Sequence, residues 1–202
     1  MTNPLFYAKI LLFGEYGIIE DSQGLTLPYS FYKGTMKLSD LDSEFEKKSN
    51  VSLQKYSEYL KNLELPENFK LNISAFQKDI KKGLFFDSNI PQGYGVGSSG
   101  ALVAAIFERY SVNKLVPENI SKDDLKNLKK VFGEMESYFH GKSSGIDPLI
   151  CYMNLPILIE NKENVDKVSI PASHEGKGAI FLIDSGMTGE TGPMVQIFFE
   201  KM

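Results

Sequence analysis

The chain has 202 residues, of which 42% are hydrophobic and 24% are charged, with a formal net charge of −4. This length and composition fit a globular protein with one large domain, or one domain and part of another. A mildly acidic chain gives no electrostatic reason to expect a nucleic-acid partner. The longest apolar runs are too short to span a bilayer and no signal peptide is visible, so we expect no membrane partner.

The few cysteines and histidines limit which disulfides and metal sites the protein can form. Cys151 is the only cysteine, which excludes an intrachain disulfide and suits a reducing compartment. His140 and His174 are the only histidines, and no cluster with metal-ligand spacing is visible. We therefore predict a cytoplasmic protein.

The order of predicted elements favours an α+β fold. Apolar runs and alternation predict strands over residues 6–13, 29–38, 69–75, 83–88 and 179–184, with a hairpin-like continuation at 17–20 and 25–28. Helical spacing and capping signals predict helices late in 40–63, over 98–110, over 121–139, from about 147, and from about 194. Strands gather early and helices later, which argues against a doubly wound parallel sheet.

Residues 91–101 form a glycine-rich loop that runs into an apolar helix. Glycines allow positive φ and close approach to a ligand, and the free N–H groups of a helix start attract anions. The loop is a candidate phosphate cradle, with Ser98 and Ser99 placed to cap the helix or to reach a metal ion. It lacks the Gly-Lys-Ser/Thr of a P-loop and the preceding strand of a dinucleotide fingerprint. The alternative is a tight turn with a serine cap.

Two carboxylates flank the turn that follows the next helix. Glu136 lies near the end of that helix and Asp147 at the start of the following one. Phosphoryl transfer uses a carboxylate and a hydroxyl to hold a metal, and a carboxylate to orient or deprotonate the alcohol. The alternatives are a solvated helix carboxylate for Glu136 and a plain N-cap for Asp147.

Lys9 is the third candidate, because lysine is almost never buried unless it is paired. Beside Asp147, its ammonium would steady developing negative charge. The alternative is a surface side chain whose charged end reaches water.

These three segments, in this order, resemble the motifs of the GHMP small-molecule kinases. Residues 9–17 resemble the first motif. Residues 91–101 resemble the second, the ATP-binding Pro-x-x-x-Gly-Leu-Gly-Ser-Ser-Ala loop, with Val96 for Leu and Gly100 for the first Ala. The His-Gly-x-x-Ser-Gly-Ile-Asp form at 140–147 is most similar to that of the members that phosphorylate mevalonate, as is the tail from 183 to 195.

The resemblance implies both a fold and an activity. The fold would be an α+β domain like ribosomal protein S5 domain 2, with a two-layer arrangement of a mixed sheet and helices, over residues 1–175. Residues 176–202 would begin a ferredoxin-like C-terminal domain that is mostly absent. The activity would be ATP- and Mg²⁺-dependent phosphorylation of a small-molecule alcohol, similar to the conversion of mevalonate to 5-phosphomevalonate.

The resemblance also implies a role for each site residue. Asp147 would be the catalytic base and Lys9 its catalytic partner, with Ser99 and Glu136 as metal ligands. The ATP-binding residues would be Gly93, Gly95, Gly97, Ser98, Ser99 and Gly100. The substrate-binding residues would be Lys9, Glu15, Tyr16, His140, Ser144, Asp147 and Thr191.

Two departures from the family pattern leave alternatives open. Tyr16 stands where the mevalonate-phosphorylating members usually carry His, and the third motif is not found before Met202. We expect an N-terminal portion of a longer protein that exposes an apolar face. Another GHMP kinase (acting on phosphomevalonate or a sugar), a silent nucleotide- or partner-binding paralogue, and an α+β domain with an ordinary turn stay open. A homodimer is one option for its assembly.

Overall fold

The computed structural model describes residues 3–169, 182–183, 186, 189 and 191–201. Its strands are β1 (Phe6–Phe13), β2 (Gly24–Leu38), β3 (Leu84–Ser88), β4 (Ile157–Ile159) and β5 (Val165–Lys167). Its α-helices are α1 (Glu44–Lys61), α2 (Ile73–Lys81), α3 (Ser98–Tyr110), α4 (Lys122–His140), α5 (Ile146–Met153) and α6 (Thr191–Lys201). Short 3₁₀ helices cover η1 (Tyr16–Glu20), η2 (Glu67–Phe69) and η3 (Pro117–Asn119).

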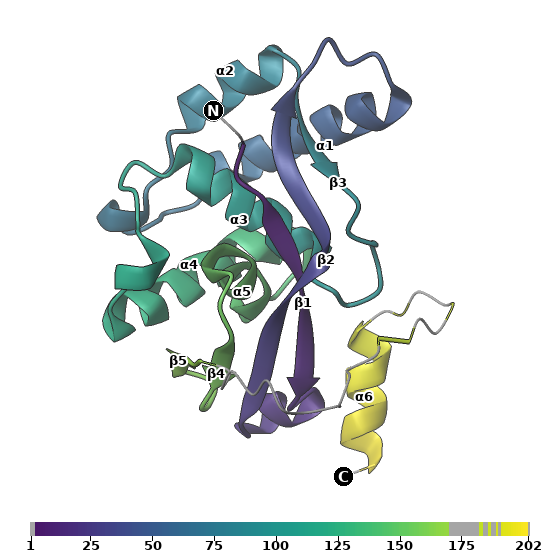
Figure 1. Cartoon of the computed structure of the whole chain (residues 1–202), viewed down its shortest axis with the longest axis vertical. Coiled ribbons are helices and arrows are strands. Elements are labelled where there is room, and N and C mark those ends of the chain that lie inside the picture. The colour runs from purple at the N-terminus through teal and green to yellow at the C-terminus, as the bar shows by residue number, and fades with distance from the viewer. Residues whose placement is uncertain (1–2, 170–181, 184–185, 187–188, 190, 202) are drawn as a thin grey trace, which may run out of the picture.

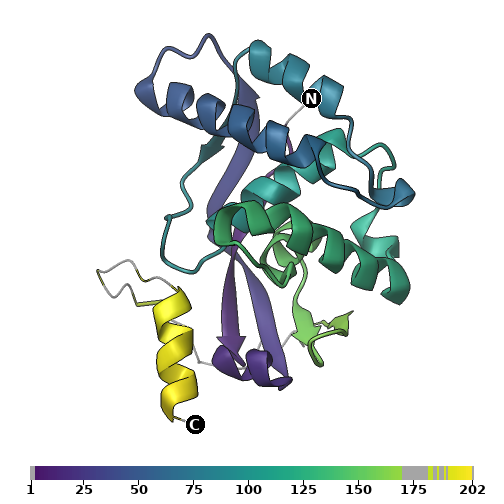
Figure 2. The same cartoon turned by 180° about the vertical axis from the view of Figure 1, so that it is seen from behind.

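The strands form one sheet with the order β1-β2-β4-β5, and β3 pairs with β2 as well. Helices α1 to α5 form a layer on one side of it, seen behind the strands in Figure 1 and in front of them in Figure 2. The predicted α+β class and two-layer arrangement are confirmed. Every pair among the described strands is antiparallel, so the mixed pairing that we expected is not found in that part of the chain.

Strand β2 is long enough to pair with three other strands. It pairs with β1 along one side, with β3 through Gly34–Leu38, and with β4 through Gly24–Thr26. Pro28 lies opposite Lys9 of β1 and falls in the gap between β3 and β4 on the other side. A proline has no N–H to donate to a neighbouring strand. Pro28 is therefore tolerated here, because β2 has no partner on that side at this position.

Three aromatic rings join α3, α4 and α5 in the core. The ring of Phe107 lies edge-on to those of Phe132 and Tyr152, with centroids 5.1 and 5.5 Å away. Phe107 and Phe132 are fully buried, and each contributes about 1.5–3 kcal/mol through apolar burial. This packing fixes the three helices whose ends carry the candidate site residues.

The capping signal before α4 is confirmed. Ser121 is the N-cap, and its hydroxyl accepts a hydrogen bond from the Asp124 amide at 3.1 Å. The helices predicted over 98–110, 121–139 and from about 147 are present within a residue or two of their expected bounds. No helix in the described part of the chain is long and apolar enough to cross a membrane.

The strand predicted over 69–75 is wrong. Phe69 ends η2, and Asn72 caps α2 by accepting from the Ala75 amide at 2.9 Å. The short alternation therefore spans the end of one helix, an extended link and the start of another. Phe76 and Ile80, four residues apart, are the pair that α2 buries.

The hairpin-like strand predicted at 17–20 is also wrong, because these residues belong to η1. Gly14, with φ of 98°, turns the chain so tightly that a Cβ there would lie 2.5 Å from the Gly24 Cα. The extended prediction at 25–28 is confirmed as part of β2. The strand predicted over 179–184 lies largely outside the described residues.

Candidate active site

A cavity of about 700 Å³ opens between the glycine-rich loop and the ends of several helices. The loop and the first turn of α3 form one wall, and α1 forms another with Lys48, Ser49 and Ser52. The ends of α4 and α5 contribute His140 and Asp147. Segments that are far apart in the sequence therefore line one cavity. They are the glycine-rich loop, the start of α3, and charged residues of other helices.

The glycine-rich loop depends on backbone conformations that glycine alone adopts easily. Gly93, Gly95 and Gly97 have φ of 80°, 69° and 82°. A Cβ on Gly97 would lie 2.8 Å from Lys9 Cγ, whereas one on Gly95 would meet nothing within 4 Å. Gly97 is the N-cap of α3 and no side chain caps that helix, so the serine-cap alternative is wrong.

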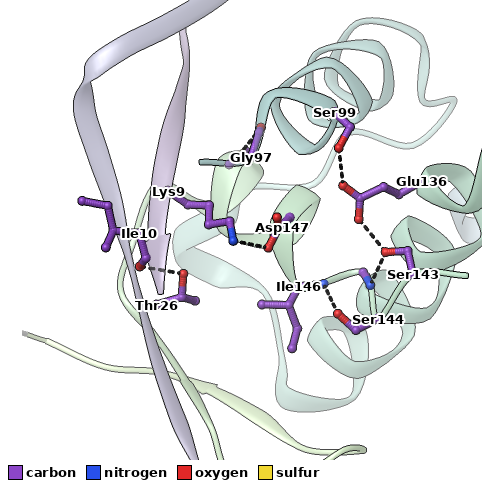
Figure 3. Close-up of polar contacts among 12 residues, drawn as sticks. Lys9, Ile10, Thr26, Gly97, Ser99, Glu136, Ser143, Ser144, Ile146 and Asp147 are labelled. Atoms are coloured by element: carbon purple, nitrogen blue, oxygen red, sulfur yellow. Dashed lines mark hydrogen bonds and ion pairs between the residues drawn. The ribbon is translucent and has the colours of Figure 1, made fainter. Parts of the chain in front are cut away.

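The Ser99 hydroxyl reaches across to α4 instead of capping its own helix. Ser99 Oγ donates to Glu136 Oε1 at 2.9 Å and lies 3.0 Å from His140 Nε2 (Figure 3 draws the first contact). When the single Ser99 hydrogen is given to Glu136, the Ser99 oxygen can accept a hydrogen bond from the His140 tautomer that carries its proton on Nε2. The structure therefore brings together three predicted site residues from two helices.

Glu136 is a buried carboxylate and not the solvated one of the alternative reading. Only 3% of the residue is exposed. Burial raises its pKa from 4.5 to about 7, with repulsion from Asp147 adding to the rise and hydrogen bonds from Ser143 and Ser99 opposing it. A buried carboxylate with nearby hydroxyl oxygen is the donor chemistry that Mg²⁺ prefers.

Lys9 and Asp147 form an ion pair of 2.9 Å (Figure 3), and Asp147 lines the cavity. Lys9 is only 8% exposed, so the surface alternative is wrong. Burial alone would lower the pKa of Lys9, but attraction and a hydrogen bond from Asp147 outweigh it and the pKa is raised. Asp147 is not the N-cap of α5, because Gly145 holds that position.

Ser143 is a residue that sequence reasoning missed. Its Oγ donates to Glu136 Oε2 at 2.5 Å and accepts from the Gly145 amide at 3.0 Å. The signal that points to it is its place in the turn between Glu136 and Asp147, where a hydroxyl can reach either end.

The other predicted residues lie in different places. Ser98 lines the cavity, but Gly100 packs against α5, where a Cβ would lie 2.7 Å from the carbonyl carbon of Asp147. Ser144 is exposed, and its hydroxyl accepts from the Ile146 amide at 3.4 Å.

The remaining predicted residues, Glu15, Tyr16 and Thr191, lie toward the two ends of the chain. Glu15 is exposed between β1 and η1, close enough to raise the pKa of Lys9. Tyr16 begins η1 and Thr191 begins α6. Gly189, just before α6, donates its amide to the Gly93 carbonyl at 3.1 Å and lines the cavity.

Comparison with known proteins identifies the domain. Residues 58–154 match the family described as GHMP kinases N terminal domain. Over these residues the chain is similar to a GHMP kinase N-terminal domain. Within the matched residues of this GHMP domain lie the glycine-rich loop, Glu136 and Asp147, whereas Lys9 precedes them.

Solved structures share the fold of the GHMP domain. The L. major mevalonate kinase in complex with R-mevalonate aligns with 100% of this chain at a TM-score of 0.56 and 14% identity. The Methanococcus jannaschii mevalonate kinase aligns with 83% at a TM-score of 0.50 and 16% identity. The chain spans 61% and 56% of the lengths of these two proteins. A search of curated protein sequences found no match.

Proposed function

We propose that this protein takes part in phosphoryl transfer from ATP to a small-molecule alcohol, with mevalonate as the proposed acceptor. The observation that carries the proposal is the ion pair between the buried Lys9 and Asp147, because Asp147 lines the same cavity as Ser99, whose hydroxyl contacts Glu136. Phosphoryl transfer to an alcohol requires a carboxylate that can accept the alcohol proton, placed beside a loop that binds the phosphates.

In the proposed reaction, Asp147 accepts the proton of the alcohol. The alcohol oxygen forms a bond to the γ-phosphorus, and the bond from that phosphorus to the bridging oxygen of ADP breaks. Lys9 stays protonated, because its pKa is raised, and its ammonium offsets the negative charge that gathers at the attacking oxygen. The loop around Gly95 and Gly97 holds the phosphates through backbone N–H groups.

Ser99 and Glu136 would hold Mg²⁺ in this proposal. The residues fit the ion, because Mg²⁺ is usually bound by one or two carboxylates together with substrate phosphates. Within the described residues no group of three or more histidine, cysteine or acidic side chains could hold a metal ion by itself. When bound, Mg²⁺ neutralises charge on the phosphate oxygens.

Mevalonate is proposed from the form of residues 140–147 and from a fold shared with a mevalonate kinase solved with R-mevalonate. His140 lines the cavity and contacts Ser99, and we propose that it also borders the acceptor. Roles for Glu15, Tyr16, Ser144 and Thr191 in acceptor binding stay proposals, as does the division into domains at residue 175. A cytoplasmic location is likewise proposed.

The test is ADP release with Mg-ATP and mevalonate, phosphomevalonate or galactose, each measured for the native chain and for Asp147→Asn. Mevalonate-dependent release that the variant loses, with nucleotide binding intact, would support the reaction and the base. Release with another acceptor would reassign the substrate within the family. An Asp147→Asn variant of full activity would refute the role of Asp147. Nucleotide binding without any release would favour a silent binding protein.

A further inference from the structure

We propose that Ser143 is a positioning residue that fixes the carboxylate of Glu136 for metal binding. This inference rests on the proposed function, because that function makes Glu136 a metal ligand. Ser143 does not line the cavity, and the proposed reaction gives it no role of its own.

The hydroxyl and the amide of Ser143 both form hydrogen bonds, to the end of α4 and to the turn that follows it. Its hydroxyl donates to Glu136 Oε2 at 2.5 Å and accepts from the Gly145 amide at 3.0 Å. Its own amide donates to Ser137 Oγ at 3.2 Å. A hydroxyl has one hydrogen to give, so the donor is committed to Glu136.

The two oxygens of Glu136 are divided between two hydroxyl groups. Ser99 holds Oε1 and Ser143 holds Oε2, from opposite sides of the carboxylate (Figure 3). Because Ser143 occupies Oε2, the carboxylate cannot rotate freely, and Oε1 stays beside Ser99, which lines the cavity. Ser143 thereby selects which oxygen is presented to an ion.

The same hydroxyl ties Glu136 to the start of α5. Gly145 is the N-cap of α5, and Asp147 follows two residues later. Gly145 has φ of 75°, and a Cβ there would collide with the Lys129 carbonyl of α4, so the turn is packed tightly on that helix. Ser143 therefore connects the carboxylate of Glu136 to a rigid turn and not to a free loop.

Loss of this hydroxyl should weaken metal binding without abolishing the fold. Partners that orient a metal ligand typically account for 10–100-fold in metal affinity. In Ser143→Ala, Oε2 of Glu136 loses its donor, and the carboxylate is free to turn Oε1 away from Ser99. Ser143→Thr keeps a hydroxyl at the same position and should restore the contact.

The experiment measures the affinity of AMP-PNP by calorimetry, once with Mn²⁺ and once with EDTA, on the whole chain. The ratio of the two affinities is the gain that the metal provides. We expect a gain in the native protein that Glu136→Gln removes, that Ser143→Ala lowers about tenfold, and that Ser143→Thr largely restores. The affinity in EDTA should be unchanged by Ser143→Ala.

Ser121→Ala is the matched control, since Ser121 caps the other end of α4 and does not contact Glu136. It should lower the melting temperature and keep the full metal gain. If it loses the gain as well, or if Ser143→Ala weakens binding equally in EDTA, Ser143 is merely structural and the inference is overturned. If Ser143→Ala does not fold, Ser143→Cys replaces it, because a thiol is a weak donor and the same loss is expected.

The proposed function and the inference fail in different ways. A gain that Glu136→Gln removes and Ser143→Ala keeps overturns the role of Ser143 alone. A native protein that binds no AMP-PNP, or whose gain survives Glu136→Gln, overturns the proposed metal site together with this inference.

Discussion

Lys9 Nζ lies 2.9 Å from Asp147 Oδ1, although the first residue belongs to the first strand and the second to α5. The Lys9 amide also donates to the Val96 carbonyl at 3.0 Å, which attaches β1 to the glycine-rich loop. Gly97 packs against the stem of the same lysine. One residue of β1 therefore fixes the distance between the anion cradle and the proposed base.

Lys9→Met should lower turnover strongly and stability modestly. It removes the ammonium that offsets charge in the proposed reaction. Breaking a buried ion pair costs 3–5 kcal/mol, but a third of the Asp147 side chain is exposed and can be hydrated, so we expect about 1–3 kcal/mol. Chemical denaturation and ADP release on the same preparations measure both effects. Unchanged turnover would contradict a role for Lys9 in charge stabilisation.

Glu136 should make stability fall as pH rises. Its folded pKa of about 7 lies above the ordinary value of 4.5, so the folded state keeps the proton while the unfolded state has lost it. This contribution is fully present below pH 4.5, declines between 4.5 and about 7, and is constant above. We expect a decline on the order of 1–3 kcal/mol in metal-free buffer.

Denaturation curves from pH 4 to 8 measure that decline, and Glu136→Gln is the matched comparison because its amide does not titrate. The difference between the two proteins isolates Glu136 from the other titrating groups. Parallel curves for the two proteins would show that Glu136 ionises normally and that its burial does not have the expected effect.

Gly100→Ala should destabilise the protein although alanine is the better helix former. The helix gains about 1 kcal/mol from the change. The new Cβ, however, would lie 2.7 Å from the Asp147 carbonyl carbon and 2.8 Å from the Pro148 nitrogen, which are backbone atoms. Overpacking of this kind costs about 1–3 kcal/mol, so the clash outweighs the gain.

Gly133→Ala in α4 tests the same kind of clash at a position where the neighbouring atoms lie slightly farther away. Its nearest contact would be the Ser143 carbonyl oxygen at 3.0 Å, so a smaller loss is expected. The melting temperatures of the two variants measure this, and that of Gly100→Ala should be the lower one. A Gly100→Ala protein more stable than the native chain would mean that α3 and α5 separate easily, contrary to the close contact.

Tyr56→Phe should destabilise more than Tyr59→Phe. Both hydroxyls donate to α4, Tyr56 to the Met135 carbonyl at 3.0 Å and Tyr59 to the Glu134 carbonyl at 2.7 Å. The Tyr56 bond is buried, and its loss should cost about 1 kcal/mol, while water replaces the exposed Tyr59 bond. Denaturant midpoints compare the two, and equal losses would contradict this ordering.

The sequence alone was enough for features that depend on local chemistry. The glycines at 93, 95 and 97 adopt positive φ, which few other residues tolerate, and Ser121 marks the start of α4 through its own hydroxyl. Local alternation failed at 69–75, because Asn72 offers a cap that favours a helix from the next residue. Short patterns of two-residue period cannot distinguish a strand from the junction of two helices.

Contacts between distant segments required the tertiary structure. Nothing in the sequence separates a buried Glu136 from a solvated one, since burial is decided by how α3, α4 and the following turn pack. Ser143 lies in an ordinary polar turn, and its contact with Glu136 exists only because that turn folds back on α4. The motifs in the sequence therefore determined which groups are available, and packing decided which of them meet.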